Sequence, residues 1–505
     1  MAREVPHRGA ITVCVMLATI MQALDTTIAN VALPYMQGTL SATLDQINWV
    51  LTSYIVAAAI MTPVTGFLAA RFGRKRLFLV TVAGFTAASV LCGMAASLSQ
   101  MVLFRLLQGV FGAPLVPLSQ SVLLDSYPRE QHGSAMAMWG VGVMVGPILG
   151  PTLGGWLTEY YNWRWVFYIN LPVGILTFLG LSAFLSESVR NVELSFDWFG
   201  FLMLSLAIGS LQMMLDRGEQ LDWFGSREIV LETAVAGLAF YLFLVHTFTT
   251  DRPFISPAMF RDRNFAVGLF FIFVVGIILL ATLALLTPYL QSLMGYPVLT
   301  AGTVLAPRGI GTMVAMIIVG RLISRIDPRL LVLLGLVLTA AVLWEMTGFT
   351  PDVSKWTLIR TGIVQGLGLG FMFVPLSTIT FATLAPAFRT QGTALFSLMR
   401  NLGSSIGISF VTFLLARNTQ IMHADLAAHV TPFNQALREG AAARIWNLGT
   451  LAGRAALNGE ITRQATIVAY ANDFKLMMIV ALAAVPLIFL LRKAKAQGDS
   501  HAVLE

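Results

Sequence analysis

Long apolar runs recur along the whole chain and constrain its possible folds more than any other feature of the sequence. Runs of 18 or more mostly apolar residues are long enough to cross a bilayer as helices. They are expected near 10–33, 47–69, 77–97, 100–123, 134–158, 165–185, 198–215, 229–249, 265–289, 301–322, 330–348, 357–381, 393–416 and 472–491. Only 11% of the 505 residues are charged, whereas water-soluble domains carry roughly a quarter. The sequence therefore predicts an all-α polytopic membrane protein with 14 transmembrane helices.

The sequence lacks the residue patterns that several other classes of protein require. Cys14 and Cys92 lie in apolar runs, so no disulfide framework is expected. The 6 histidines show no metal-ligand spacing, and Gly never precedes Lys, which excludes a P-loop. No nucleophile–base set is present, so we expect no enzymatic activity, metal or cofactor. Arg3 and Arg8 precede the first run without a cleavage site, which indicates a retained helix rather than a signal peptide.

Basic residues in the short loops predict the orientation of these helices. With the N-terminus in the cytoplasm, the cytoplasmic segments hold 18 Lys and Arg residues. The short outside loops then hold 4, namely Arg164, Arg217, Arg227 and Lys355. Both termini are therefore expected in the cytoplasm, and the net charge of +7 needs no nucleic acid partner.

One outside segment is long and spans residues 417–471. The periodicity of its stretch 427–457 predicts short amphipathic helices. Two interpretations stay open: the segment caps the outer mouth of the bundle, or it is a docking surface for a partner.

Short motifs repeat in parallel at a spacing near 255 residues, always in the same order. The pairs are Gly66–Arg71 with Gly320–Arg325, Gln108–Gly109 with Gln365–Gly366, Pro117–Ser119 with Pro375–Ser377, and Gly133–Met136 with Gly392–Leu395. They predict an N-terminal six-helix half (1–190), an inserted two-helix linker (191–260) and a C-terminal six-helix half (261–505). Parallel halves with the substrate site between them near the midplane form the architecture of major facilitator transporters.

Charged residues inside the predicted spans are expensive and are functional candidates. Asp25 and Arg105 are expected at similar depths, roughly 12 and 8 Å below the outer surface, and to face one another across a water-accessible cleft. A carboxylate beside a cation can exchange a proton during transport; the alternative is a static ion pair that fixes two helices. In the second half, Arg360 occupies the repeat position of Arg105, and Glu345 is expected at the outer rim. The other charged residues there are Arg400, Arg308, Asp473 and Lys475.

Glycines spaced by four mark the fifth predicted span, at Gly142, Gly146, Gly150 and Gly154, with Pro147 between them. Such a stripe lets a neighbouring backbone come close. It is interpreted as tight packing together with a sliding, sealing contact between the two halves.

The same segments resemble the fourteen-span drug:proton antiporters of the major facilitator superfamily. The resemblance lies in 24–34, in 105–109 with its Arg105, in the antiporter motif 140–155, in 163–174 and in 209–224, the last being similar to EmrB-type multidrug permeases. It implies proton-driven efflux of hydrophobic compounds across a Gram-negative inner membrane, with Asp25 and Arg105 in proton coupling. It also implies a periplasmic membrane-fusion adaptor and an outer-membrane channel as partners.

The loop after the second span departs from the superfamily pattern. Gly66, Arg71, Gly73 and Arg74 match that pattern, but Ala70 stands where an Asp is usual and helps to lock the cytoplasmic gate. We hypothesise that Asp125, at the inner end of the fourth span, pairs with Arg71 or Arg74 instead.

The predicted substrate surface is apolar and adaptable, since 23 Met and 33 Phe residues are available. Polar candidates near it are Gln22, Asn30, Gln108, Gln120, Gln365 and Arg400. Two other functions remain possible: a dedicated transporter of a single metabolite with the same fold, and a membrane sensor or scaffold that transports nothing.

Overall fold

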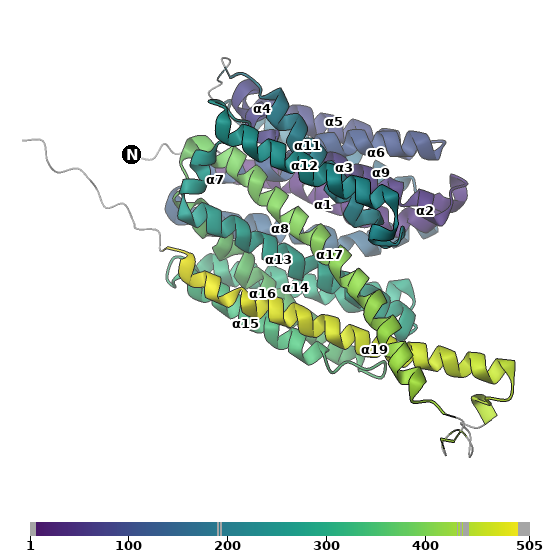
Figure 1. Cartoon of the computed structure of the whole chain (residues 1–505). Coiled ribbons are helices and arrows are strands. Elements are labelled where there is room, and N and C mark those ends of the chain that lie inside the picture. The colour runs from purple at the N-terminus through teal and green to yellow at the C-terminus, as the bar shows by residue number, and fades with distance from the viewer. Residues whose placement is uncertain are drawn as a thin grey trace, which may run out of the picture.

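The computed structural model describes residues 7–188, 191, 194–431, 433–434, 437 and 444–492. Four residues of the predicted charge asymmetry, Arg3, Arg190, Lys493 and Lys495, lie outside the described residues, as does part of the outside segment 417–471. Within the described ranges the chain is helical and contains no β-strand (Figure 1).

The first half of the chain forms a bundle of helices, several of which are broken. They are α1 (Arg8–Thr39), α2 (Leu44–Ile47), α3 (Trp49–Met61), α4 (Thr65–Phe72), α5 (Arg74–Met94), α6 (Leu98–Gly112), α7 (Leu115–Ser126), α8 (His132–Tyr160), α9 (Trp165–Tyr168) and α10 (Asn170–Phe184). Pro63 lies at the break between α3 and α4, and Pro114 at the break between α6 and α7. Proline removes a backbone donor and so interrupts a helix without ending the span.

The rest of the chain adds a helix pair and a second bundle. These helices are α11 (Trp198–Arg217), α12 (Arg227–Thr249), α13 (Arg263–Pro288), α14 (Val298–Leu322), α15 (Pro328–Met346), α16 (Lys355–Ala382), α17 (Arg389–Ala428) and α19 (Leu451–Ala483). In the described part of the chain, 13 helices are long and apolar enough to cross a bilayer, and the pair α3–α4, bent by 56°, makes up to 14. The predicted all-α fold with fourteen transmembrane helices is confirmed.

Each bundle is held by its own helix contacts. In the first, α1 packs against α7, α8 and α10, and α6 packs against α3 and α5. In the second, α16 packs against α13, α14 and α15, and α17 packs against α13 and α19. The inserted helix α11 contacts α12, α3 and α17, and therefore touches both bundles (Figure 1).

The two bundles contact each other from about their middle to one end. This end, where α1 begins, is here called the inner end. Helix α8 packs against α14, and α17 packs against α7 and α4. The hydroxyls of Ser121 and Thr390 are 2.8 Å apart, and the Thr393 hydroxyl donates to the Pro117 carbonyl at 3.0 Å. A Cβ on Gly320 would lie 2.8 Å from the Cβ of Ala137, so these helices are in close contact. The structure is thus closed at its inner end.

Two helices extend far beyond the bundle at the outer end. The predicted span 393–416 belongs to α17, which continues to Ala428, and the predicted span 472–491 belongs to a helix that already begins at Leu451 (Figure 1). The prediction of separate short amphipathic helices over 427–457 is therefore wrong at both edges of that stretch. Neighbouring helices support one another there, for example through the His423–Asn458 hydrogen bond of 3.0 Å.

Candidate functional site: a buried carboxylate–guanidinium network

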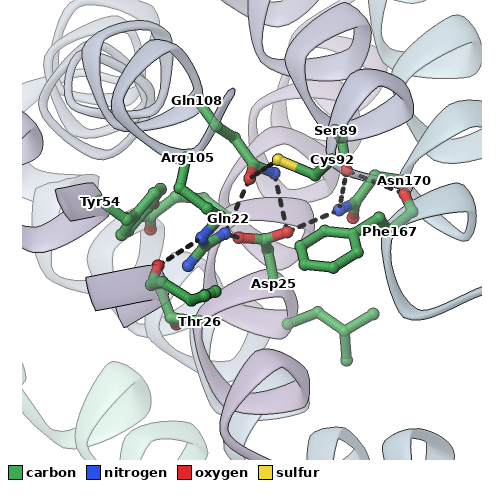
Figure 2. Close-up of polar contacts among 12 residues, drawn as sticks. Gln22, Asp25, Thr26, Tyr54, Ser89, Cys92, Arg105, Gln108, Phe167 and Asn170 are labelled. Carbon is green, nitrogen blue, oxygen red and sulfur yellow. Dashed lines mark hydrogen bonds and ion pairs between the residues drawn. The ribbon is translucent and has the colours of Figure 1, made fainter. Parts of the chain in front are cut away.

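Polar groups from five helices meet at one buried point in the first half, and Figure 2 shows their side chains pointing toward one another. Arg105 and Gln108 are three residues apart on α6 and therefore share a face. Asn170 begins α10, and the Arg164 side chain fixes the preceding turn by donating to the carbonyls of Gly93 and Ala95 at 2.8 and 2.7 Å. The remaining groups are Asp25 on α1, the Val50 carbonyl on α3, and Ser89 and Cys92 on α5.

The Asp25 carboxylate accepts three hydrogen bonds. Arg105 Nη1 donates to Oδ2 at 2.7 Å, Gln108 Nε2 donates to Oδ1 at 2.8 Å, and Asn170 Nδ2 donates to Oδ1 at 3.0 Å. The Asn170 amide also donates to the Ser89 hydroxyl at 2.9 Å, so its orientation is fixed from a second side. A buried carboxylate needs both a counter-charge and further donors, and this arrangement supplies both.

The Arg105 guanidinium is held as tightly as its partner. Its Nε donates to the Val50 carbonyl at 3.0 Å, and Nη1 also donates to Gln108 Oε1 at 2.7 Å. Its Cζ lies 4.4 Å from the centroid of the Tyr54 ring and 5.8 Å from that of Phe167. These aromatic faces contribute cation–π attraction and exclude solvent.

The side chains of Asp25 and Arg105 are each only 1% exposed. The structure therefore contradicts the predicted water-accessible cleft between them: the two groups are in direct contact and sealed. Packing that the sequence does not reveal causes this. The rings of Tyr54 and Phe167 close over the guanidinium, and the amides of Gln108 and Asn170 cover the carboxylate.

The sequence analysis assigned no role to four members of the network, Tyr54, Ser89, Phe167 and Asn170. Asn170 lies inside the segment 163–174 that carries part of the family resemblance, which was the available signal. Tyr54 gave no signal, because a tyrosine in an apolar helix is usual. Gln22 donates to the Tyr54 hydroxyl at 3.2 Å and lies at the edge of the network.

The polar residues predicted to face substrate occupy different environments. Gln108 is completely buried and bonded within the Asp25 network, so it is not part of an open wall. The exposed Asn30 side chain donates to the Thr26 carbonyl of its own helix at 3.1 Å. Gln120 and Gln365 are completely buried, and neither amide has a hydrogen-bond partner among the described residues. Arg400 is half-buried, with Nη2 3.5 Å from Asn401 Oδ1.

The glycine stripe of α8 faces α1 rather than the second half. A Cβ on Gly142 would lie 2.9 Å from the Met16 side chain, and one on Gly146 would lie 2.7 Å from the Ala23 backbone. Gly150 and Gly154 similarly approach Thr27 and Ile28, whereas Pro147 is exposed. The predicted sliding contact between the halves is therefore wrong for this stripe. Instead, the stripe fixes the segment of α1 that carries Asp25, and another face of α8 meets α14.

Asp125 joins the two halves at the inner end. It forms ion pairs with Arg74, one of the two predicted partners, and with Arg389 of α17. The other predicted partner, Arg71, donates to the Leu194 carbonyl instead. Arg389 was not foreseen, because its contact joins positions 264 residues apart.

Two glycines in this gate are required by their positions. A Cβ on Gly66 would lie 2.8 Å from the Cα of Gln391, so α4 and α17 approach closely there. Gly73 has φ of 91° at the junction between α4 and α5, a conformation that favours glycine.

The second half has no equivalent of the buried pair at the position that the repeat indicates. Arg360 forms an ion pair with Glu345, but these side chains are 54% and 36% exposed, which agrees with a rim position. Asp473 is buried and Lys475 is exposed. The proton-coupling candidates of the two halves are thus asymmetric.

Comparison with known proteins decides the family. The model described as Major Facilitator Superfamily matches residues 15–408. This chain belongs to the major facilitator superfamily. The predicted family resemblance is confirmed.

Within the superfamily, the chain is 38% identical over 440 residues to the multidrug export protein EmrB of Escherichia coli (strain K12), covering 86% of each chain. It is 37% identical over 492 residues to the fatty acid resistance protein FarB of Neisseria gonorrhoeae, covering 96% of this chain and 97% of the relative.

Solved structures agree on the major facilitator fold. The human organic anion transporter MFSD10 superposes with a TM-score of 0.59 at 14% identity, covering 94% of this chain and all of the other. A bacterial homologue of the human lysosomal transporter Spinster gives a TM-score of 0.55 at 19% identity, covering 96% and 97% of the two chains. At such identities the likeness concerns the fold alone. As a major facilitator transporter, the chain is a multi-pass membrane protein that acts on small molecules.

Proposed function

We propose that this transporter exports hydrophobic and amphipathic toxic compounds in exchange for protons. The sealed Asp25–Arg105 network carries this proposal, because it holds an ionisable carboxylate inside the membrane at a point where five helices converge. The names of the relatives, multidrug export and fatty acid resistance, support amphipathic substrates.

The cycle follows from the contacts of Asp25. Protonation cancels the charge that holds Arg105 and Gln108, so the carboxyl releases α6 from α1 and the network rearranges. Because the carboxylate is only 1% exposed, a proton reaches it when the helices part transiently, and protonation then stabilises the separated arrangement. The proton step is thereby linked to the reorientation of the halves. Moving one charge across the membrane supplies about 2.3 kcal/mol per 100 mV.

We place the protein in the inner membrane of a Gram-negative cell, with both termini in the cytoplasm. The excess of basic residues at the inner end supports this orientation. Of these residues, Arg74 and Arg389 also form the closed gate.

The extension of α17 and α19 beyond the bundle is the proposed docking surface for a periplasmic membrane-fusion adaptor of a tripartite system with an outer-membrane channel. It presents apolar side chains, among them Ile421, Leu451 and Val468, which are 48%, 79% and 40% exposed. Exposed apolar side chains on a projecting hairpin favour a protein partner. Cross-linking from Cys introduced at Ile421 to a co-expressed adaptor tests this surface, with Trp344 at the rim of α15 as the control position.

Substrate-triggered proton release from liposomes tests the export mechanism. We expect wild type to release protons when a lipophilic cation or a lipophilic acid is added, and Asp25→Asn to abolish this flux. Glu345→Gln is the matched control, since it removes a carboxylate that is also paired with an arginine but is exposed at the rim.

The outcomes separate the competing functions. Proton flux at the wild-type rate in Asp25→Asn would refute the role of Asp25. Flux with one compound only would favour a dedicated exporter, and no flux with any compound would favour a sensor or scaffold.

A further inference from the structure

A buried arginine in the second half has no carboxylate partner among the described residues. Arg308 on α14 is 7% exposed. Its Nη2 donates to the Leu279 carbonyl of α13 at 2.9 Å, whereas Nη1 has no hydrogen-bond partner among the described residues. None of the ion pairs found in that part of the chain includes Arg308. Its charge is therefore uncompensated, unlike that of Arg105.

Arg308 lies where the two halves meet. The next residue, Gly309, contacts Ile148 of α8 in the first half, since a Cβ there would overlap the Ile148 side chain. Arg308 is fourteen residues from the inner end of α14, or roughly 21 Å at 1.5 Å per residue. It is also ten residues, or roughly 15 Å, from the outer end of the same 25-residue helix. Arg308 therefore lies near the middle of the span, at the depth expected for a site between the halves.

A second buried polar group lies on the turn of α16 that packs against Arg308. A Cβ on Gly362 would lie 3.8 Å from the Cβ of Arg308, and Gly366 directly contacts the Arg308 backbone carbonyl. Gln365, between these glycines, is 0% exposed, and neither its Oε1 nor its Nε2 has a partner in the described ranges. Helices α14 and α16 thus hold a cation and an unsatisfied amide at the same level.

The geometry points to Arg308 as a binding site for the acidic group of an organic anion with an apolar tail. A guanidinium offers a planar fork that matches a carboxylate or sulfonate. Inside the membrane its attraction for an anion is strengthened by the low dielectric, whereas a cation is repelled. The Gln365 amide supplies a further donor for the same group. This inference rests on the proposed export function and adds the charge class of the substrate.

Binding measured in nanodiscs of electrically neutral lipid tests this assignment. The probes are dodecanesulfonate and dodecyltrimethylammonium, which share an apolar tail and differ in the sign of the head group. Binding is followed by the intrinsic fluorescence of the 10 tryptophans. We expect Arg308→Met to raise the Kd of the sulfonate about tenfold or more relative to that of the cation. Arg308→Lys keeps the charge and is expected to retain part of the preference, and Arg360→Gln is the control for a rim arginine.

Equal changes in both Kd values in Arg308→Met would show a purely structural role and overturn the assignment, as would an unchanged Kd for the sulfonate. Arg308→Lys keeps the test decisive if the Met variant does not fold. A failure of the proposed export function can be distinguished from a failure of this assignment, because the binding measurement requires no proton flux. Proton release triggered by the cation in wild type reports on export separately.

Discussion

Replacing Arg389 with glutamine is expected to open the inner gate. Arg389 reaches from α17 to Asp125 at the end of α7 and thereby joins the two halves. Its side chain is 10% exposed and that of Asp125 is 25% exposed, so the pair lies between a surface ion pair, worth about 0.2–1 kcal/mol, and a buried one, whose disruption costs about 3–5 kcal/mol. We therefore take about 1–2 kcal/mol as the free energy by which this pair favours the closed state. Losing it changes the ratio of closed to open molecules by a factor of about 5–30.

The distance between spin labels at Gln131 and Ser324 measures this ratio. Both positions are exposed. Gly133, two residues from Gln131, contacts Ile323, the neighbour of Ser324, across the halves, so the closed state gives a short distance. The native cysteines, Cys14 and Cys92, are buried and interfere little with labelling. We expect Arg389→Gln to increase the ratio of long-distance to short-distance molecules by a factor of about 5–30.

A double-mutant cycle decides whether the ion pair is the cause. Asp125→Asn should open the gate to a similar or smaller degree, and the double variant should open it no further than Arg389→Gln, because both substitutions remove the same Arg389–Asp125 pair. Asp125→Asn also removes the Arg74 pair, which lies within the first half, and Arg389→Gln also removes the bond to the Leu124 carbonyl. The bonds of Ser121 with Thr390 and of Thr393 with Pro117 remain, so complete opening is not expected. Additive effects of the two substitutions, or an unchanged distance in either variant, would refute the reasoning.

Two further substitutions test how the site is built. Gly146→Ala places a Cβ 2.7 Å from the Ala23 backbone and should lower stability by about 1–3 kcal/mol. Gly155→Ala on the same helix is the control, because a Cβ there meets nothing within 4 Å and should leave stability unchanged. Thermal unfolding in detergent compares the two variants. Equal melting temperatures for Gly146→Ala and Gly155→Ala would contradict the assigned contact. Asn170→Leu removes one donor from the buried Asp25 carboxylate and should cost about 1.5–3 kcal/mol. That loss should largely vanish in an Asp25→Asn background, and its persistence there would show that Asn170 acts elsewhere.

Much of the fold could be predicted because a bilayer imposes simple demands on a sequence. Spans must be apolar and about 20 residues long, and the fourteen expected runs correspond to the helices observed. The ends were less predictable: α17 and α19 continue outside the bundle because they support one another, which single-helix hydropathy does not reveal.

The site was predictable only where charge placed inside a span is itself a signal. Asp25 and Arg105 stood out for that reason, and the repeat then suggested Arg360 as a counterpart of Arg105, although the structure places Arg360 at an exposed rim. Repetition preserves the position of a residue along a helix, but the direction of its side chain and the neighbours that it meets depend on packing.

The sequence by itself thus determined the membrane environment, the number of spans and the presence of one costly pair of charges, because each depends on composition along a single segment. Only the tertiary structure decided what surrounds those charges. Asn170 reaches Asp25 and the Tyr54 ring reaches Arg105 from different helices, and Arg389 reaches Asp125 from the other half. Such contacts depend on how helices distant in the chain are oriented about their axes, which local patterns of apolar residues leave open.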